Sequence, residues 1–120
     1  MAGKTWAAIA LFWAAAMTAS GVVLAHHGWG SYDAANPITI SGLIVTSEYQ
    51  NPHVVLNVEA NGKRWIIVLA PVSRMLNRGA LAELMAVGKT ISAFGYVSTV
   101  EKNELRAERV TVDGKTIEMR

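Results

Sequence analysis

The sequence predicts a small, mostly β domain with the strand order of an OB-fold, a five-stranded Greek-key barrel with one short helix. Three observations support this fold class. The chain has 120 residues, which leaves room for a single domain after a leader segment. Most of the remaining chain alternates apolar and polar residues with period two. One stretch with helical spacing lies between the third and fourth alternating segments. An open sheet with a helix on one face is the alternative architecture.

Residues 1–25 have the three parts of a secretory signal peptide. Lys4 supplies the positive charge, an uncharged apolar run follows, and Val23-Leu24-Ala25 ends the segment on small residues suited to cleavage. Cleavage there makes His26 the first mature residue, and a cut after Ser20 is the competing site. An uncleaved membrane anchor is the other alternative, but alanine and polar interruptions make the run a poor spanning helix. We therefore expect a periplasmic or secreted protein that meets the membrane only as the uncleaved precursor.

The rest of the composition excludes several classes of protein. The chain has no cysteine, so the leader cannot be a lipoprotein signal and the domain has no disulfide. Without Lys4, ten basic side chains remain against nine acidic ones, and they are interspersed. Nucleic-acid binding usually needs a clustered basic face, so we expect no nucleic-acid partner. The alternating charges of residues 101–109 predict a solvated face.

Residues 26–36 are rich in glycine and aromatics without a clear period, which predicts an N-terminal arm before a barrel domain at 37–120. The first long strand begins at Ile38 and alternates to Ser47. Gly42, near its centre, predicts a bulge or a bend, because a residue without a Cβ lets a strand coil sharply around a small barrel.

A hairpin is predicted after Asn51-Pro52, with strands at residues 53–59 and 63–69. Asn61-Gly62 between them favours a type I′ turn, in which both central residues need positive φ. Alternation along the two strands predicts a shared inward face. Its residues are Val54, Leu56, Val58, Trp65, Ile67 and Leu69.

The period lengthens after Pro71, which predicts one short helix or two helices broken at Gly79. The apolar residues that set the helical spacing are Val72, Met75, Leu76, Leu81, Leu84 and Met85. Two further strands are predicted at residues 89–97 and 104–112. Asp113-Gly114 then forms a tight turn before a short final strand at 116–119.

Four parts of the chain together resemble a known family. They are Ala25-His26-His27-Gly28-Trp29, Ile38-Thr39-Ile40-Ser41-Gly42, Asn51-Pro52-His53-Val54, and Arg78-Gly79 with Val87-Gly88. This combination is similar to exported bacterial proteins grouped as the domain of unknown function 6152, over nearly the whole mature chain. The resemblance implies a periplasmic OB-like barrel with no established activity. Family members tend to have a tryptophan soon after the Asn-Pro-His box, where this chain has Val55-Leu56-Asn57.

The three histidines, His26, His27 and His53, are candidate metal ligands. A mature terminus at His26 would offer its α-amine and its imidazole to one ion, and a second imidazole would complete a three-nitrogen site. Such nitrogen sets favour copper(II), so copper is the candidate cofactor. Glu48 or Asp33 could orient a ligand imidazole. The alternative is that the first two histidines belong to a polar tail and that His53 is exposed or bonded to a carbonyl.

Four aromatic residues are candidate contacts for a ligand or partner: Trp29 and Tyr32 in the arm, and Phe94 and Tyr96 on the outer side of the fourth strand. The alternative for the arm is a latch that packs against its own barrel. No catalytic motif is found, so an enzyme is the least supported class. Two interpretations stay open: an exported copper-binding protein, or a metal-free module that docks a protein or small ligand on the barrel face.

Overall fold

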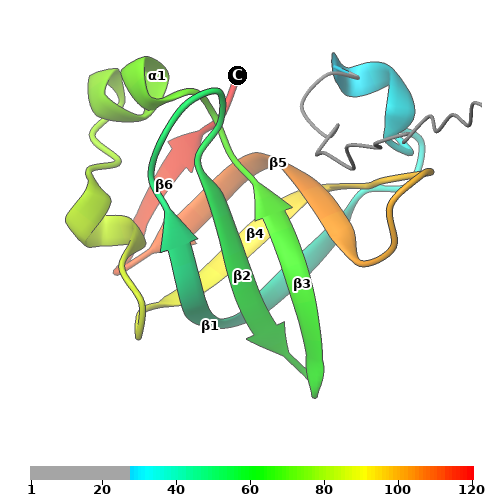
Figure 1. The fold of residues 1–120 in the computed structure, drawn as a ribbon, viewed down its shortest axis with the longest axis horizontal. Coiled ribbons are helices and arrows are strands. Elements are labelled where there is room, and N and C mark those ends of the chain that lie inside the picture. The colour runs from blue at the N-terminus through cyan, green and yellow to red at the C-terminus, as the bar shows by residue number, and fades with distance from the viewer. Residues whose placement is uncertain (1–27) are drawn as a thin grey trace, which may run out of the picture.

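The computed structural model describes residues 28–120, in which six strands form one sheet closed into a barrel (Figure 1). The strands are β1 (Ile38–Glu48), β2 (Val55–Ala60), β3 (Lys63–Val68), β4 (Thr90–Val97), β5 (Glu104–Val112) and β6 (Lys115–Glu118). The 3₁₀ helix η2 (Gly28–Ser31) precedes β1, and helix α1 (Val72–Asn77) and the 3₁₀ helix η3 (Ala82–Met85) lie between β3 and β4.

The barrel closes through a parallel pairing of β3 with β5, in which Ile66 lies opposite Glu104. The other neighbours run antiparallel in the order β3-β2-β1-β4-β5, and β6 extends β5 outside the closed ring. This arrangement confirms the predicted OB-fold order of three strands, a helix and two strands. The open sheet is wrong, because the β3–β5 pairing joins the two ends of the sheet.

Strand β1 is shared by both halves of the barrel and pairs with β2 and β4. A Cβ built on Gly42 would lie 2.1 Å from the carbonyl oxygen of Glu59 on β2, far inside van der Waals contact. The register shifts between Ile44 and Thr46, so the bulge lies beyond the glycine. Gly42 therefore marks the point where two backbones come close, and the bulge bends the strand just after it.

The hairpin of β2 and β3 follows the prediction. Asn61 has φ 52° and Gly62 has φ 75°, as a type I′ turn requires. Of the predicted inward residues, all but Trp65 are buried, and Trp65 is partly buried against the core. The second turn repeats this geometry, with φ 51° at Asp113 and 75° at Gly114.

The helical segment is broken in two at Gly79, which has φ 83° and ends α1. Met75 and Met85 are fully buried and reach the core from the two separate pieces. Leu76 and Leu81 are 49% and 48% exposed, so the residues that set the helical spacing do not all face the core. The left-handed turn at Gly79 changes the chain direction. The helical spacing of the side chains therefore does not continue from α1 into η3.

Within residues 28–120, no helix is long and apolar enough to cross a membrane. The predicted leader at 1–25 lies outside the described residues, as do His26 and His27.

Candidate functional site

The arm joins the barrel at the end of β4. Tyr32 forms an antiparallel bridge with Ser98, and the Asp33 amide donates a hydrogen bond of 2.9 Å to the carbonyl of Val97. Tyr32 is only 7% exposed. The arm therefore packs against the barrel, as the latch alternative expected, and it lies beside β5 on the side away from α1 (Figure 1).

Two charged residues of β5, Glu104 and Arg106, are buried beneath the arm. Glu104 is 1% exposed and Arg106 is 9% exposed. Leu105 between them belongs to the core. Because successive side chains of a strand point to opposite faces, Glu104 and Arg106 point to the outer face of the barrel, toward the arm. The prediction of a solvated face at 101–109 is wrong for these two residues, because the arm covers them.

Tyr32 and Glu104 are joined by a short hydrogen bond in which the phenol O–H donates to Oε2 of the carboxylate. Burial, and then the hydrogen bond and the negative charge of Glu104, raise the pKa of Tyr32 far above its usual range. The phenol therefore stays protonated and remains a donor at physiological pH. This contact fixes the arm to a buried carboxylate.

Trp29 is held by two arginines. The guanidinium carbons of Arg106 and Arg120 each lie 4.3 Å from a centroid of its indole ring. The ring of Tyr96 meets it edge-on at 5.9 Å between centroids. Cation–π contacts contribute about 0.5–2 kcal/mol each, more where water is excluded. These intramolecular contacts cover part of the Trp29 indole and leave less of its surface for a ligand to stack on.

The remaining aromatics continue this row along β4. Phe94 lies 6.3 Å from Tyr96, and the guanidinium of Arg109 lies 4.8 Å from the Phe94 centroid. The Tyr96 hydroxyl donates to Oε1 of Glu108 at 3.2 Å. Phe94 and Tyr96 are both partly exposed, so they stay available as contacts at the rim of the arm.

The residues of the Asn-Pro-His box contact two different parts of the fold. Oδ1 of Asn51 accepts the Val72 amide at the start of α1, at 3.1 Å, and the Asn51–Pro52 peptide bond is cis. His53 then places its Nε2 3.3 Å from a terminal nitrogen of Arg106. A guanidinium can only donate, so Nε2 accepts and the imidazole is neutral with its proton on Nδ1. The box thus connects α1 to the cluster beneath the arm, which we call the arm–barrel junction: Trp29, Tyr32, His53, Glu104, Arg106 and Arg120.

The cationic surroundings favour neutral His53. Burial lowers the pKa of His53 below its usual 6.5, and the charges of Arg106 and Arg74 lower it further. The unfolded chain therefore binds a proton at His53 at a higher pH than the folded protein does. Stability that is intact above the unfolded pKa is lost as the pH falls toward the lower folded pKa.

This linkage gives a pH prediction. Between pH 7.5 and pH 5, the wild-type protein is expected to lose more stability than the variant His53→Gln, whose amide oxygen can still accept from Arg106 without titrating. Urea unfolding of both proteins at several pH values measures the difference. Parallel losses in the two proteins would show that His53 does not titrate abnormally in the folded state.

Two buried nitrogens of the arm–barrel junction have no hydrogen-bond partner among residues 28–120. They are Nδ1 of His53 and Nε of Arg106. Both carry a hydrogen in the arrangement described above, and a buried donor without an acceptor costs about 1–3 kcal/mol. An acceptor from water, from a ligand or from outside the described residues would fit both positions. Sequence reasoning singled out Trp29, Tyr32 and His53 but missed Glu104 and Arg106, because nothing local in β5 signals that the arm covers them.

The three-histidine copper site stays a prediction, because His26 and His27 lie outside the described residues. In the part of the chain that the structure describes, no group of three His, Asp or Glu side chains is placed to hold a metal. The carboxylate of Asp33 accepts hydrogen bonds from the Ala35 amide and from Asn36, so it stabilises its own turn. Glu48 is exposed at the end of β1.

Solved structures are similar to this chain in fold. A chain of the Stn1–Ten1 complex of S. pombe matches with a TM-score of 0.52 and 22% identity, covering 63% of this chain and 57% of that chain. A mutant of TiaS lacking its ZRD, in complex with agmatine, matches with a TM-score of 0.51 and 12% identity. It covers 72% of this chain and 27% of that one. This chain thus spans less than two thirds of either protein, and the likeness is one of fold alone.

Comparison with curated proteins finds no match. The family of unknown function DUF6152 has a model that matches residues 14–106, which includes the arm, the Asn-Pro-His box and β5 as far as Arg106. The chain belongs to this family.

Proposed function

We propose that this protein is exported to the periplasm and works there as a metal-free binding module, whose ligand or protein partner contacts the arm–barrel junction. The composition of residues 1–25 supports export. One observation supports the site: Arg106 is nine-tenths buried, yet its Nε and the neighbouring Nδ1 of His53 lack acceptors among residues 28–120. Buried donors without acceptors are uncommon in folded proteins and often mark functional positions.

The chemistry of the junction suits a partner that supplies oxygen acceptors. Arg106, Arg74 and Arg120 bring three positive charges close to His53 and Trp29, whereas Glu104 and Glu108 bring two negative ones. Phe94 and Tyr96 beside it add partly exposed aromatic surface. If the arm shifts to uncover the two buried N–H groups, a backbone carbonyl or a carboxylate could meet them while apolar groups pack on these rings.

Site-specific photocrosslinking in living cells tests this proposal. A photoreactive phenylalanine analogue at Tyr96 is expected to give a discrete adduct, seen by intact mass, that weakens when Arg106→Lys is added. The matched control places the analogue at Lys63, at the tip of the β2–β3 hairpin at the far end of the barrel from the arm (Figure 1). Equal adducts at both positions, or an adduct indifferent to Arg106→Lys, would contradict a site at the junction.

Copper binding is the second candidate, and a specific observation favours it. Arg106 contacts both Trp29 and His53, so the docked indole lies in the same cluster as the third histidine. His27 is two residues from Trp29, a reach of at most about 7 Å of extended chain. Against copper, Arg106 fixes the proton of His53 on Nδ1 and occupies Nε2, and the arginines repel a dication. Copper coordination by His53 therefore requires Arg106 to release it.

A titration separates the two candidates. Protein purified from the periplasm is first weighed intact, because the copper site needs His26 as its first residue. Cu(II) titration followed by electron paramagnetic resonance should then show one tight, nitrogen-rich site that His53→Ala weakens, if copper is the ligand. The metal-free function predicts only weak adventitious copper and no effect of His53→Ala on it. A terminus at Gly21 would remove the amine chelate and with it the copper candidate.

A further inference from the structure

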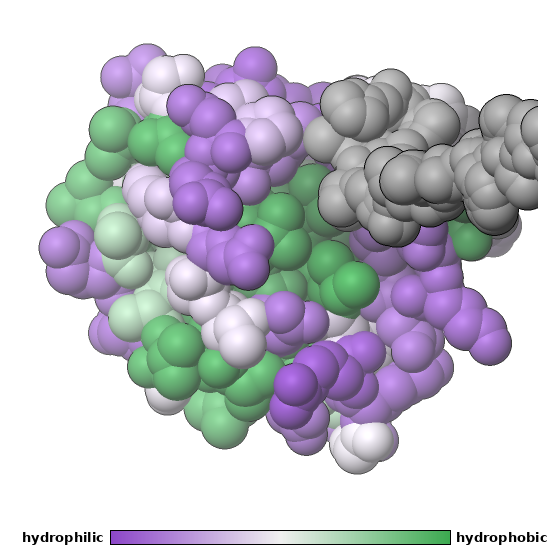
Figure 2. Space-filling view, in the orientation of Figure 1, coloured by the Kyte–Doolittle hydropathy of each residue, from purple (hydrophilic) through white to green (hydrophobic). Residues whose placement is uncertain are grey.

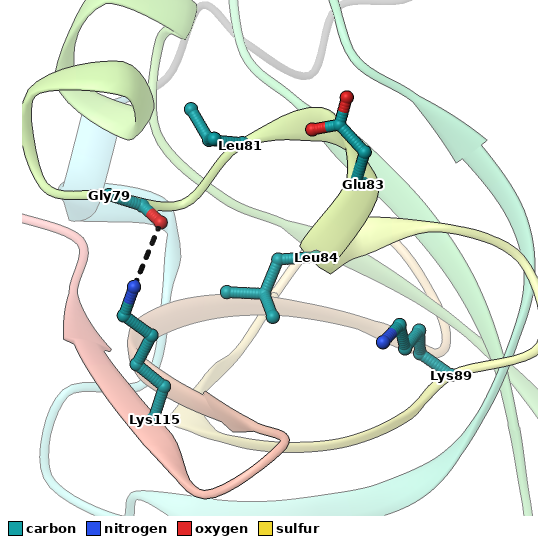
Figure 3. A pocket seen from close by; sticks show the side chains of 6 residues that line it. All are labelled: Gly79, Leu81, Glu83, Leu84, Lys89 and Lys115. Atoms are coloured by element: carbon teal, nitrogen blue, oxygen red, sulfur yellow. Dashed lines mark hydrogen bonds between the residues drawn. The ribbon is translucent and has the colours of Figure 1, made fainter.

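A second candidate site lies on the α1 side of the barrel, apart from the arm–barrel junction. A cavity of about 240 Å³ opens between the segment that follows α1 and the start of β6. It is lined by Gly79, Leu81, Glu83, Leu84, Lys89 and Lys115. Figure 3 shows these residues arriving from three separate segments, with Leu84 in the middle and the two lysines to either side.

The polar groups directed at the cavity are ammonium groups. Lys115 makes a long hydrogen bond of 3.5 Å to the carbonyl of Gly79, the dashed line in Figure 3. An ammonium has three N–H donors, so Lys115 keeps donor capacity after this contact. Lys89 is paired with the carboxylate of Asp113, which satisfies part of its charge. The carboxylate of Glu83 is exposed and points away from the space between the two lysines (Figure 3).

The remainder of the lining is apolar. Leu84 packs partly against the core and presents the rest of its side chain to the cavity. Leu81 is 48% exposed at the rim, and Leu76 on α1 is 49% exposed. Figure 2 shows hydrophobic surface gathered on this side of the molecule, where Figure 1 places α1 and the segment after it. An apolar floor beneath an ammonium suits an acid with a short hydrocarbon tail.

We propose that this cavity binds a small aliphatic carboxylate, whose oxygens accept hydrogen bonds from Lys115 while its tail covers Leu84 and Leu81. The volume lies below the usual 300–1,000 Å³ of ligand pockets, so the tail has only a few carbons. A free short-chain acid and the C-terminal leucine of a peptide share this chemistry. The site is independent of the arm–barrel junction and of whatever binds there.

A nuclear magnetic resonance titration of the purified protein with hexanoate tests the site. Amide shifts are expected at Gly79, Leu84 and Lys115 at millimolar hexanoate, and not with hexanamide, which has the same tail without the charge. Lys115→Gln should weaken binding roughly twofold to fivefold, the usual value of an ion pair at an exposed lysine. Lys115→Arg should retain most of it, and Lys102→Gln, an exposed lysine before β5, should leave it unchanged.

Two peptides distinguish the source of the carboxylate. An acetylated tripeptide that ends in leucine with a free carboxylate should bind more tightly than hexanoate if the natural ligand is a chain terminus, and less tightly if it is a free acid. The amidated tripeptide should not bind in either case. No shifts with hexanoate, equal shifts with hexanamide, or unchanged affinity in a folded Lys115→Gln variant would overturn the proposal.

Discussion

Replacing Arg106 with leucine is expected to lower the free energy of unfolding by about 3–5 kcal/mol, the usual cost of removing one partner from a buried charged cluster. The substitution leaves Glu104 beneath the arm at 1% exposure without its neighbouring cation. It also removes one cation from Trp29 and the donor to His53. Urea unfolding followed by tryptophan fluorescence measures the loss and reports the release of the arm at the same time.

Two further variants serve as controls for Arg106→Leu. Arg109→Leu removes an exposed guanidinium from the same strand, paired with Glu118 and lying over Phe94, and should cost far less stability than Arg106→Leu. The double variant Arg106→Leu with Glu104→Gln removes both buried charges but keeps an amide oxygen that can accept from Tyr32, so it should recover part of the stability. If Arg106→Leu costs no more than Arg109→Leu, the junction does not stabilise the fold.

The barrel could be predicted from the sequence because its determinants are local. Alternation from Ile38 sets the faces of β1, and Asn61-Gly62 sets the register of β2 on β3, with Ala60 opposite Lys63. A single helical segment between two groups of strands then leaves few topologies open. The exposure of Leu76 and Leu81 could not be predicted from spacing, because it depends on where the helix breaks.

The candidate site could be predicted only in part. The arm aromatics Trp29 and Tyr32 stood out by composition, and a latch was one of their two interpretations. The burial of Glu104 and Arg106 cannot be predicted in the same way. They belong to a run of mixed acidic and basic residues, which is the usual pattern of a solvent-exposed strand. Their burial depends on contacts between residues 72 positions apart in the chain, Tyr32 and Glu104. The same limit holds for His53, whose partner Arg106 lies 53 residues away.

Gly42→Ala is expected to have the other large effect, a loss of about 3 kcal/mol or more, because overpacking against backbone cannot be relieved by a change of rotamer. The new methyl carbon would stand 2.1 Å from the carbonyl oxygen of Glu59 and 2.8 Å from its carbonyl carbon. Relief requires β1 to move away from β2 at the centre of the strand that joins both halves of the barrel. Urea unfolding and the dispersion of amide resonances should both report the damage.

Gly30→Ala is the matched control for Gly42→Ala, since a Cβ at Gly30 would meet nothing within 4 Å. It should change the free energy of unfolding by less than about 1 kcal/mol. Comparable stabilities for the two alanine variants would mean that β1 and β2 do not approach closely at Gly42. The curvature of β1 would then come from the bulge between Ile44 and Thr46 alone, and Gly42 would be free to vary.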